Sequence, residues 1–193
     1  MPPRSYDSTT RAAAALATRE RVLRACVDLA YERGDIEMTL EQIAGRAATT
    51  VRTVLRQFGS RDAVIEAAIE LGSAEVVAER ADPEGDPDRS IELLVAHYET
   101  RGAFVVKLLS SELAGAQRVT ASGRLVHRAW VEEVFAAGLA AAANRDALVD
   151  LLVVATDVYA WKLLRLDRGL DAATTVARLR TMTRALLAQP GDH

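Results

Sequence analysis

The stretch TLEQIAGRAATTVRTVLRQFGSRDAVI, from Thr39 to Ile65, constrains the fold most strongly. It holds two short helical patterns on either side of the sequence Ala-Ala-Thr-Thr. Helices this short are stable in water only when they pack against other elements. A turn of three to four residues with small neighbours lets one helix cross another at a steep angle. The stretch therefore predicts a pair of crossed helices supported by neighbouring helices.

Local capping signals predict where these helices begin and end. Thr39-Leu-Glu-Gln42 matches a capping box, and Thr50 can start the next helix, which ends near Phe58-Gly59. Upstream, Thr18 can cap a helix over about 19–32, which Gly34 ends. Downstream, Ser60 can cap a long helix that reaches about Arg80. After the linker ADPEGDPD, helices are expected at about 88–101, 103–116, 122–143, 145–166 and 172–188, the last capped by Asp171.

The composition favours helices throughout. Half of the 193 residues are hydrophobic, and alternating strand patterns do not exceed four or five residues. We therefore predict an all-α fold of about nine helices. The lone Cys26 excludes an intramolecular disulfide and a multi-cysteine zinc site, and its place on an apolar helix face predicts a buried side chain. The N-terminus does not resemble a signal peptide, and no apolar run reaches the ~18 residues of a membrane span, so a cytoplasmic protein is expected.

The second helix of the crossed pair has one apolar and one polar face. Val54 and Phe58 are expected to face inward, and the polar face comprises Thr50, Arg52, Thr53, Arg56 and Gln57. These side chain types can bind base edges or phosphates in a major groove. Thr39 and Arg61 lie at the starts of the flanking helices, where phosphates are commonly bound. The alternative is an ordinary helical hairpin with a solvated polar face.

Charge alone does not argue for nucleic acid. The net charge is −3, and residues 1–67 contain ten arginines against nine acidic residues. A nucleic-acid interface must therefore rest on the local arrangement of side chains rather than on bulk charge.

Residues 19–67 resemble the DNA-binding head of the TetR family of bacterial transcriptional regulators. The resemblance rests on V-L-x-A-C-x-x-L-A-x-x-x-G (22–34), T-L-E-Q-I-A-x-x-A (39–47) and T-V-L-R-Q-F-G-S-R-D (53–62). It implies a helix-turn-helix in residues 18–67, preceded by a flexible arm (1–17) and joined by the long fourth helix to a ligand-binding and dimerisation body (68–193). It further implies a homodimer on a palindromic DNA operator, released by a small effector.

The residues expected at the DNA follow from this resemblance and from the polar face. They are Thr39, Thr49, Thr50, Val51, Arg52, Thr53, Leu55, Arg56, Gln57 and Arg61. Val51 either touches a thymine methyl group or packs inward. The sequence departs from the family pattern in three places. Ala48-Thr49-Thr50 replaces Gly-Val-Ser in the turn, Leu55 stands where a phosphate-binding Tyr is usual, and Arg61 replaces a Lys.

The segment 145–166 is apolar around nearly its whole circumference, which predicts burial on every side. One face then meets the core and another a second copy, with Leu151, Val154, Val158 and Trp161 at the dimer interface; a central core helix is the alternative. A pocket for a small apolar or aromatic effector is expected to be lined by Tyr98, Phe104, Leu108, His127 and Trp130. The alternative is that these residues only pack in the hydrophobic core.

No nucleophile motif, phosphate loop or metal-ligand spacing is present, and we expect neither a cofactor nor a metal site. The sequence therefore favours a ligand-responsive transcriptional regulator, most simply a repressor, over an enzyme. A small helical enzyme or ligand-binding protein that keeps the head as a scaffold is the alternative. A membrane partner is not expected.

Overall fold

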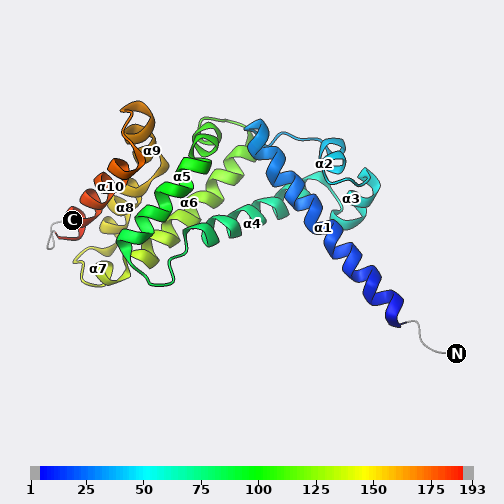
Figure 1. Ribbon diagram of the computed structural model, residues 1–193, viewed down its shortest axis with the longest axis horizontal. Helices are drawn as coiled ribbons and strands as arrows, with labels where there is room; N and C mark the ends of the chain where they lie inside the picture. The colour runs from blue at the N-terminus through cyan, green and yellow to red at the C-terminus, as the bar shows by residue number, and fades with distance from the viewer. Residues whose placement is uncertain (1–4, 189–193) are drawn as a thin grey trace. The chain divides into compact units, whose positions relative to one another are not determined.

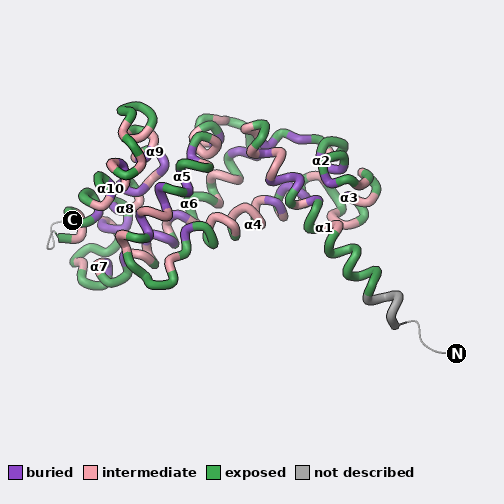
Figure 2. Tube along the Cα trace, viewed as in Figure 1, coloured by how far each residue is buried: buried purple, intermediate pink, exposed green. Residues whose placement is uncertain are grey.

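The structure, a computed structural model, describes the backbone of residues 5–188 and side chains from Thr10 onward. Within these residues the fold is all-α, as predicted, and contains no strand. No helix there is long and apolar enough to cross a membrane. The chain divides into two compact units, one up to Gly72 (the first unit) and one from Ser73 onward (the second unit). Each unit has its own buried core (Figure 2).

The first unit contains α1 (Ser5–Arg33), α2 (Leu40–Arg46), α3 (Val51–Phe58) and the beginning of α4 (Arg61–Arg80). Helices α1, α2 and α3 all pack on one another (Figure 1). Val22, Ile43, Val54 and Val64 form the centre of this core, each with no exposed surface. These apolar contacts hold the two short helices, neither of which is long enough to be stable alone.

The first helix begins earlier than predicted. The sequence placed its start near Arg19, whereas α1 is helical from Ser5. Residues 5–17 therefore belong to this helix and are not a separate arm. Residues 1–4 of the predicted arm lie outside the described range. The reason is that Thr18 does not act as a cap: its hydroxyl donates to the carbonyl of Ala14 at 2.8 Å, inside the helix. The alanine-rich segment before it has high helix propensity.

The second unit contains α5 (Pro87–Leu109), α6 (Ala114–Val134), α7 (Ala136–Ala140), α8 (Arg145–Thr156), α9 (Val158–Lys162), the π-helical turn η1 (Leu163–Asp167) and α10 (Ala172–Leu187). Helix α5 packs against α6, α9 and α10, and α8 packs against α6 and α10 (Figure 1). Their shared core includes Leu94, Val131, Leu152 and Leu179, all fully buried.

The predicted break at Gly102 is wrong, because α5 runs through it. A Cβ at this position would lie 2.5 Å from Cζ3 of Trp161, so the glycine allows the indole to pack directly on the helix backbone. The predicted helix over 145–166 is instead split at Asp157, whose extended backbone (ψ 155°) lets its carboxylate cap α9 by accepting the N–H of Tyr159. The predicted helix 122–143 likewise forms two helices, since α6 begins at Ala114 and ends before Phe135.

Candidate nucleic-acid interface

The turn between α2 and α3 is closed by backbone hydrogen bonds of the Schellman type. The N–H of Thr49 donates to the carbonyl of Ala44 at 2.9 Å, and that of Ala48 donates to Gly45 at 3.2 Å. This pattern requires a left-handed residue just after the helix, and Ala48 occupies that position with φ +50°. The capping box predicted at the other end of α2 is confirmed, with Thr39 and Gln42 bonded reciprocally.

We expect Ala48→Gly to stabilise the protein by about 1 kcal/mol, because a left-handed conformation is unfavourable for alanine and accessible to glycine. Denaturant unfolding of the two proteins measures the difference. Ala47→Gly is the matched control: Ala47 has φ −79° and is 4 % exposed, so the same substitution there should destabilise. A loss of stability in Ala48→Gly would contradict the left-handed turn.

Helix α3 is fixed at both ends. Thr50 caps its start, accepting the N–H of Thr53 at 3.2 Å, as predicted. Val54 is fully buried in the middle. At the far end, the guanidinium of Arg19 stacks over the ring of Phe58 at 4.1 Å and donates to the carbonyl of Gln57 at 3.4 Å. The helix is therefore held rigidly against α1.

The outward side of α3 carries Arg52, Leu55 and Arg56, which we call the exposed α3 face. Arg52 and Arg56 are one helical turn apart and both exposed, and Leu55 between them is 38 % exposed. Neither guanidinium makes a hydrogen bond or ion pair within the part of the chain that the structure describes. Val51, Thr49 and Thr53 are half-buried at the edge of this face, and Thr50 is exposed.

Gln57 does not belong to the exposed α3 face. Its side chain turns back to α1, where Nε2 donates to the carbonyl of Ala15 at 3.1 Å, and its Oε1 is buried without a hydrogen-bond partner. The sequence placed Gln57 beside the arginines because helical spacing allows it. The early start of α1, which brings Ala15 within reach, was not predicted and redirects this amide.

Arg61 is also engaged within the protein. Its Nε donates to the carbonyl of Met38 at 2.6 Å, and its Nη2 lies 3.7 Å from the carboxylate of Glu37. The arginine thus ties the start of α4 to the segment preceding α2. A phosphate contact at Arg61 would have to compete with these bonds. Met38 also contacts the buried Cys26 (Sγ to Sδ 3.4 Å), and burial raises the pKa of that thiol to about 11.

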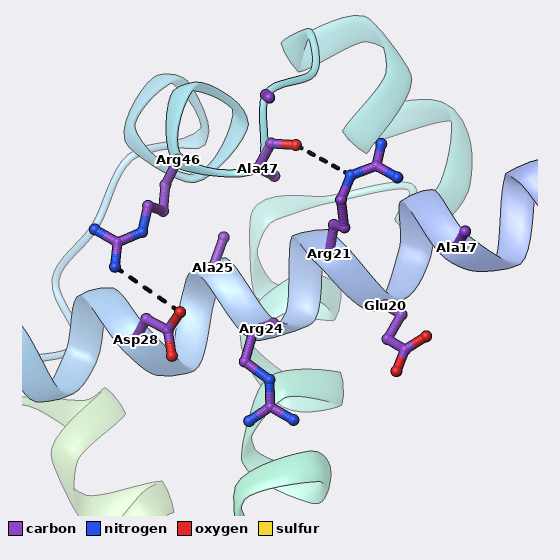
Figure 3. Close-up of a pocket in the computed structure, with 9 residues that line it drawn as sticks. Ala17, Glu20, Arg21, Arg24, Ala25, Asp28, Arg46 and Ala47 are labelled. Atoms are coloured by element: carbon purple, nitrogen blue, oxygen red, sulfur yellow. Dashed lines mark hydrogen bonds and ion pairs between the residues drawn. The ribbon is translucent and has the colours of Figure 1, made fainter.

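An open cleft of about 580 Å³ lies between α1 and the end of α2 (Figure 3). Arg21 reaches across it, and its Nε points at the carbonyl of Ala47 at 3.5 Å. Arg46 reaches back to α1, bonding Glu32 at 2.9 Å and approaching Asp28 at 3.9 Å. The charges of this cleft therefore support the α2–α3 turn. Sequence reasoning missed Arg21, since an arginine on a helix carries no local sign of its distant partner.

The five residues expected to line a ligand pocket lie in the second unit, and most of them are core. Tyr98, Leu108, His127 and Trp130 are 3–8 % exposed, and Phe104 is half-buried. The hydroxyl of Tyr98 donates to the carbonyl of Thr156 at 3.1 Å. The rings of His127 and Trp130 stack with centroids 5.7 Å apart.

The four residues predicted at the dimer interface divide into two pairs. Val154 is 69 % and Leu151 37 % exposed on α8. Val158 and Trp161 are instead core residues, 4 % and 3 % exposed, so their assignment to a surface is wrong. The break at Asp157 explains this, because it re-orients α9 relative to the face of α8.

Other large apolar side chains are exposed on the elements that follow α8. Tyr159, Leu163, Leu166 and Met182 are each 37–56 % exposed, on α9, η1 and α10. None of these four residues was predicted at the interface. Their apolar character is evident from the sequence, but their exposure depends on how α9, η1 and α10 pack, which the sequence does not show.

Comparison with known proteins does not assign the chain to a family. No protein-family model matches the chain, and no curated protein matches it. Its function must therefore be inferred from its own residues.

Proposed function

We propose that the protein is a DNA-binding transcriptional regulator whose first unit is a helix-turn-helix domain with α3 as the recognition helix. The exposed α3 face carries this proposal. Two arginines one turn apart, with no bond to the protein's own described residues, project from a short helix that packing and caps hold rigid. Arginine binds the O6 and N7 atoms of guanine in a bidentate manner, and rigid presentation reduces the ordering cost of binding.

Leu55 suits the same role, because an exposed aliphatic side chain between two base-reading groups can contact a thymine methyl group. The first turn of α3 contains no acidic residue, so the positive end of its dipole is not offset near a phosphate backbone. Base contacts by Arg52 and Arg56, rather than bulk charge, would then supply the specificity.

This function is tested by fluorescence anisotropy with duplex DNA from upstream of the protein's own gene. We expect saturable binding that survives competition by unrelated duplex DNA and weakens as salt rises. Binding that unrelated DNA abolishes equally well would contradict a specific regulator.

We further propose that the regulator acts as a homodimer on a palindromic operator, which matches the two-fold symmetry of a dimer. Exposed apolar side chains on α8 and on the following segment up to α10 support this assembly, with Val154 the most exposed of them. If these side chains form one surface, a partner that covers them would remove that apolar surface from water.

We expect Val154→Glu to convert the dimer to a monomer, because it places a carboxylate in an apolar interface without a partner. Sedimentation velocity gives the oligomeric state, and circular dichroism reports folding. Leu125→Glu is the control, since Leu125 is 72 % exposed on α6 and lies outside the proposed interface. A folded Val154→Glu dimer, or a monomeric Leu125→Glu variant, would place the interface elsewhere.

The second unit is proposed to bind a small, largely apolar effector that releases DNA. Its aromatic set, including Tyr98, Phe104 and Trp130 with Leu108 and His127, supports this proposal through its composition. Effector and operator must then weaken each other's binding by the same factor.

A further inference from the structure

The core of the second unit contains a cluster of polar groups that its apolar packing does not require. Arg80, His97, His127 and Thr156 are all at most 7 % exposed. The guanidinium carbon of Arg80 lies 5.4 Å from the ring centre of Tyr98. Burying a cation and two imidazoles in a core costs free energy, and this cost is offset only where their polar atoms are paired or hydrogen-bonded.

Part of this cluster is satisfied within the protein. The Nδ1 of His97 pairs with the carboxylate of Glu79 at 2.8 Å, and that carboxylate also receives the guanidinium of Arg101 at 2.9 Å. Glu79 is therefore already shared between two partners. Around His127, by contrast, two polar atoms are buried without a hydrogen-bond partner, Nδ1 of His127 and Nε1 of Trp130.

The tautomer of His127 follows from its neighbour. The hydroxyl of Thr156 donates to the carbonyl of Leu152 at 2.7 Å, so it accepts from the Nε2–H of His127 at 3.1 Å. Nδ1 of the neutral ring then carries a bare lone pair, and it is buried without a hydrogen-bond partner. Burial, and after it the charge of Arg80, lowers the pKa of His127 to about 4, while the backbone of Val153 acts in the opposite direction.

A second unsatisfied atom lies on the adjacent ring. The indole of Trp130 stacks on His127 at an interplanar angle of 12°, and its Nε1–H is buried with no acceptor. A buried donor left without a partner destabilises a protein by roughly 1–3 kcal/mol. The stacked rings thus carry one unsatisfied acceptor, Nδ1 of His127, and one unsatisfied donor, the indole N–H of Trp130. The positive charge of Arg80 acts on the same histidine.

We propose that this site binds the carboxyl group of an apolar monocarboxylic acid. One carboxylate oxygen accepts the indole N–H of Trp130, and the other shares with Nδ1 of His127 a proton that is taken up from solvent on binding. The positive charge of Arg80 stabilises the bound anion. The site is closed in the present structure, since these side chains are more than nine-tenths buried, so binding requires local opening of the core. The binding site itself does not depend on the proposed function. Only the role of this acid as the effector rests on the proposed function.

The test is isothermal titration of the full-length protein with sodium benzoate, 4-phenylbutyrate and octanoate, each compared with its neutral amide. We expect at least one acid to bind about tenfold or more tightly than its amide, because charge-assisted hydrogen bonds are the stronger ones. Arg80→Gln should reduce the acid to the affinity of the amide. Arg89→Gln, which changes an exposed arginine on α5, should leave binding unchanged.

Trp130→Phe keeps the ring and removes the N–H, so it tests the site even if Arg80→Gln does not fold. We expect acid affinity to fall several-fold while stability is unchanged or higher, because the lost donor had no partner. The inference is overturned if no acid binds at millimolar concentration, if amides bind equally well, or if Trp130→Phe binds acid normally.

Anisotropy with the upstream DNA, measured on the same samples, separates this inference from the proposed function. Acid binding that leaves DNA affinity unchanged supports the acid site and contradicts its role as effector. A protein that binds the acid and no DNA supports the site and contradicts the regulator.

Discussion

We expect acidification from pH 7 to pH 5 to lower the free energy of unfolding by about 2 kcal/mol for each of the two buried histidines, His97 and His127. Burial is the main cause, followed by the positive charge of Arg80, and together they lower the pKa of each ring from 6.5 to about 4. For His97 the bond to Glu79 acts in the opposite direction, and the charge of Arg101 adds to the lowering.

The sign follows from proton linkage. Between pH 6.5 and pH 4 the unfolded chain binds protons at these histidines and the folded chain does not. Their contribution to the free energy of unfolding is therefore fully present above pH 6.5 and is lost as the pH drops toward 4. Urea unfolding at pH 7, 6 and 5 measures the effect, and His97→Gln and His127→Gln should each remove about half of it. Equal stability at pH 7 and pH 5 would show that the histidines are not buried in the neutral form.

The second large effect concerns the exposed α3 face. We expect the double variant Arg52→Ala, Arg56→Ala to bind its operator about 100-fold more weakly or worse, since each lost bidentate base contact costs ~1–3 kcal/mol. Stability should be nearly unchanged, because both side chains are exposed and bond to none of the described residues. Operator affinity at several salt concentrations, with matched and one-base-changed duplexes, provides the measurement.

Two controls sharpen this prediction. Arg124→Ala removes an exposed arginine of α6 in the second unit and should not change operator binding. Arg61→Ala should weaken binding to all DNA sequences by the same factor, because Arg61 holds the segment around Met38 and does not contact a base. If the double variant changes only the salt dependence and keeps its base preference, the arginines bind phosphates and another surface reads the sequence.

Local signals predicted much of the first unit. The capping box at Thr39, the cap at Thr50 and the left-handed Gly34 and Gly59 depend on residues within a few positions of one another, so the sequence specifies them. The cap at Asp171 was predicted for the same reason. The exposure of Arg52 and Arg56 followed from the period of a helix anchored by Val54.

Two of the failures involve contacts between distant segments, whereas the early start of α1 and the break at Asp157 have local causes. Gln57 bonds Ala15, 42 positions away, and nothing near Gln57 indicates this. Gly102 resembles a helix breaker, but its partner Trp161 comes from another helix. Asp157 splits a segment whose apolar pattern is continuous, and as a result Val158 and Trp161 enter the core.

The central claim, that α3 reads specific DNA, is tested most directly by selecting binding sites from random duplex DNA with the wild-type protein and with the Arg52→Ala, Arg56→Ala variant. We predict that the wild-type protein enriches an inverted repeat with guanine at a fixed position in each half, and that the variant enriches no such sequence. Folded wild-type protein that enriches no sequence, or a variant that enriches the same repeat, would contradict the claim.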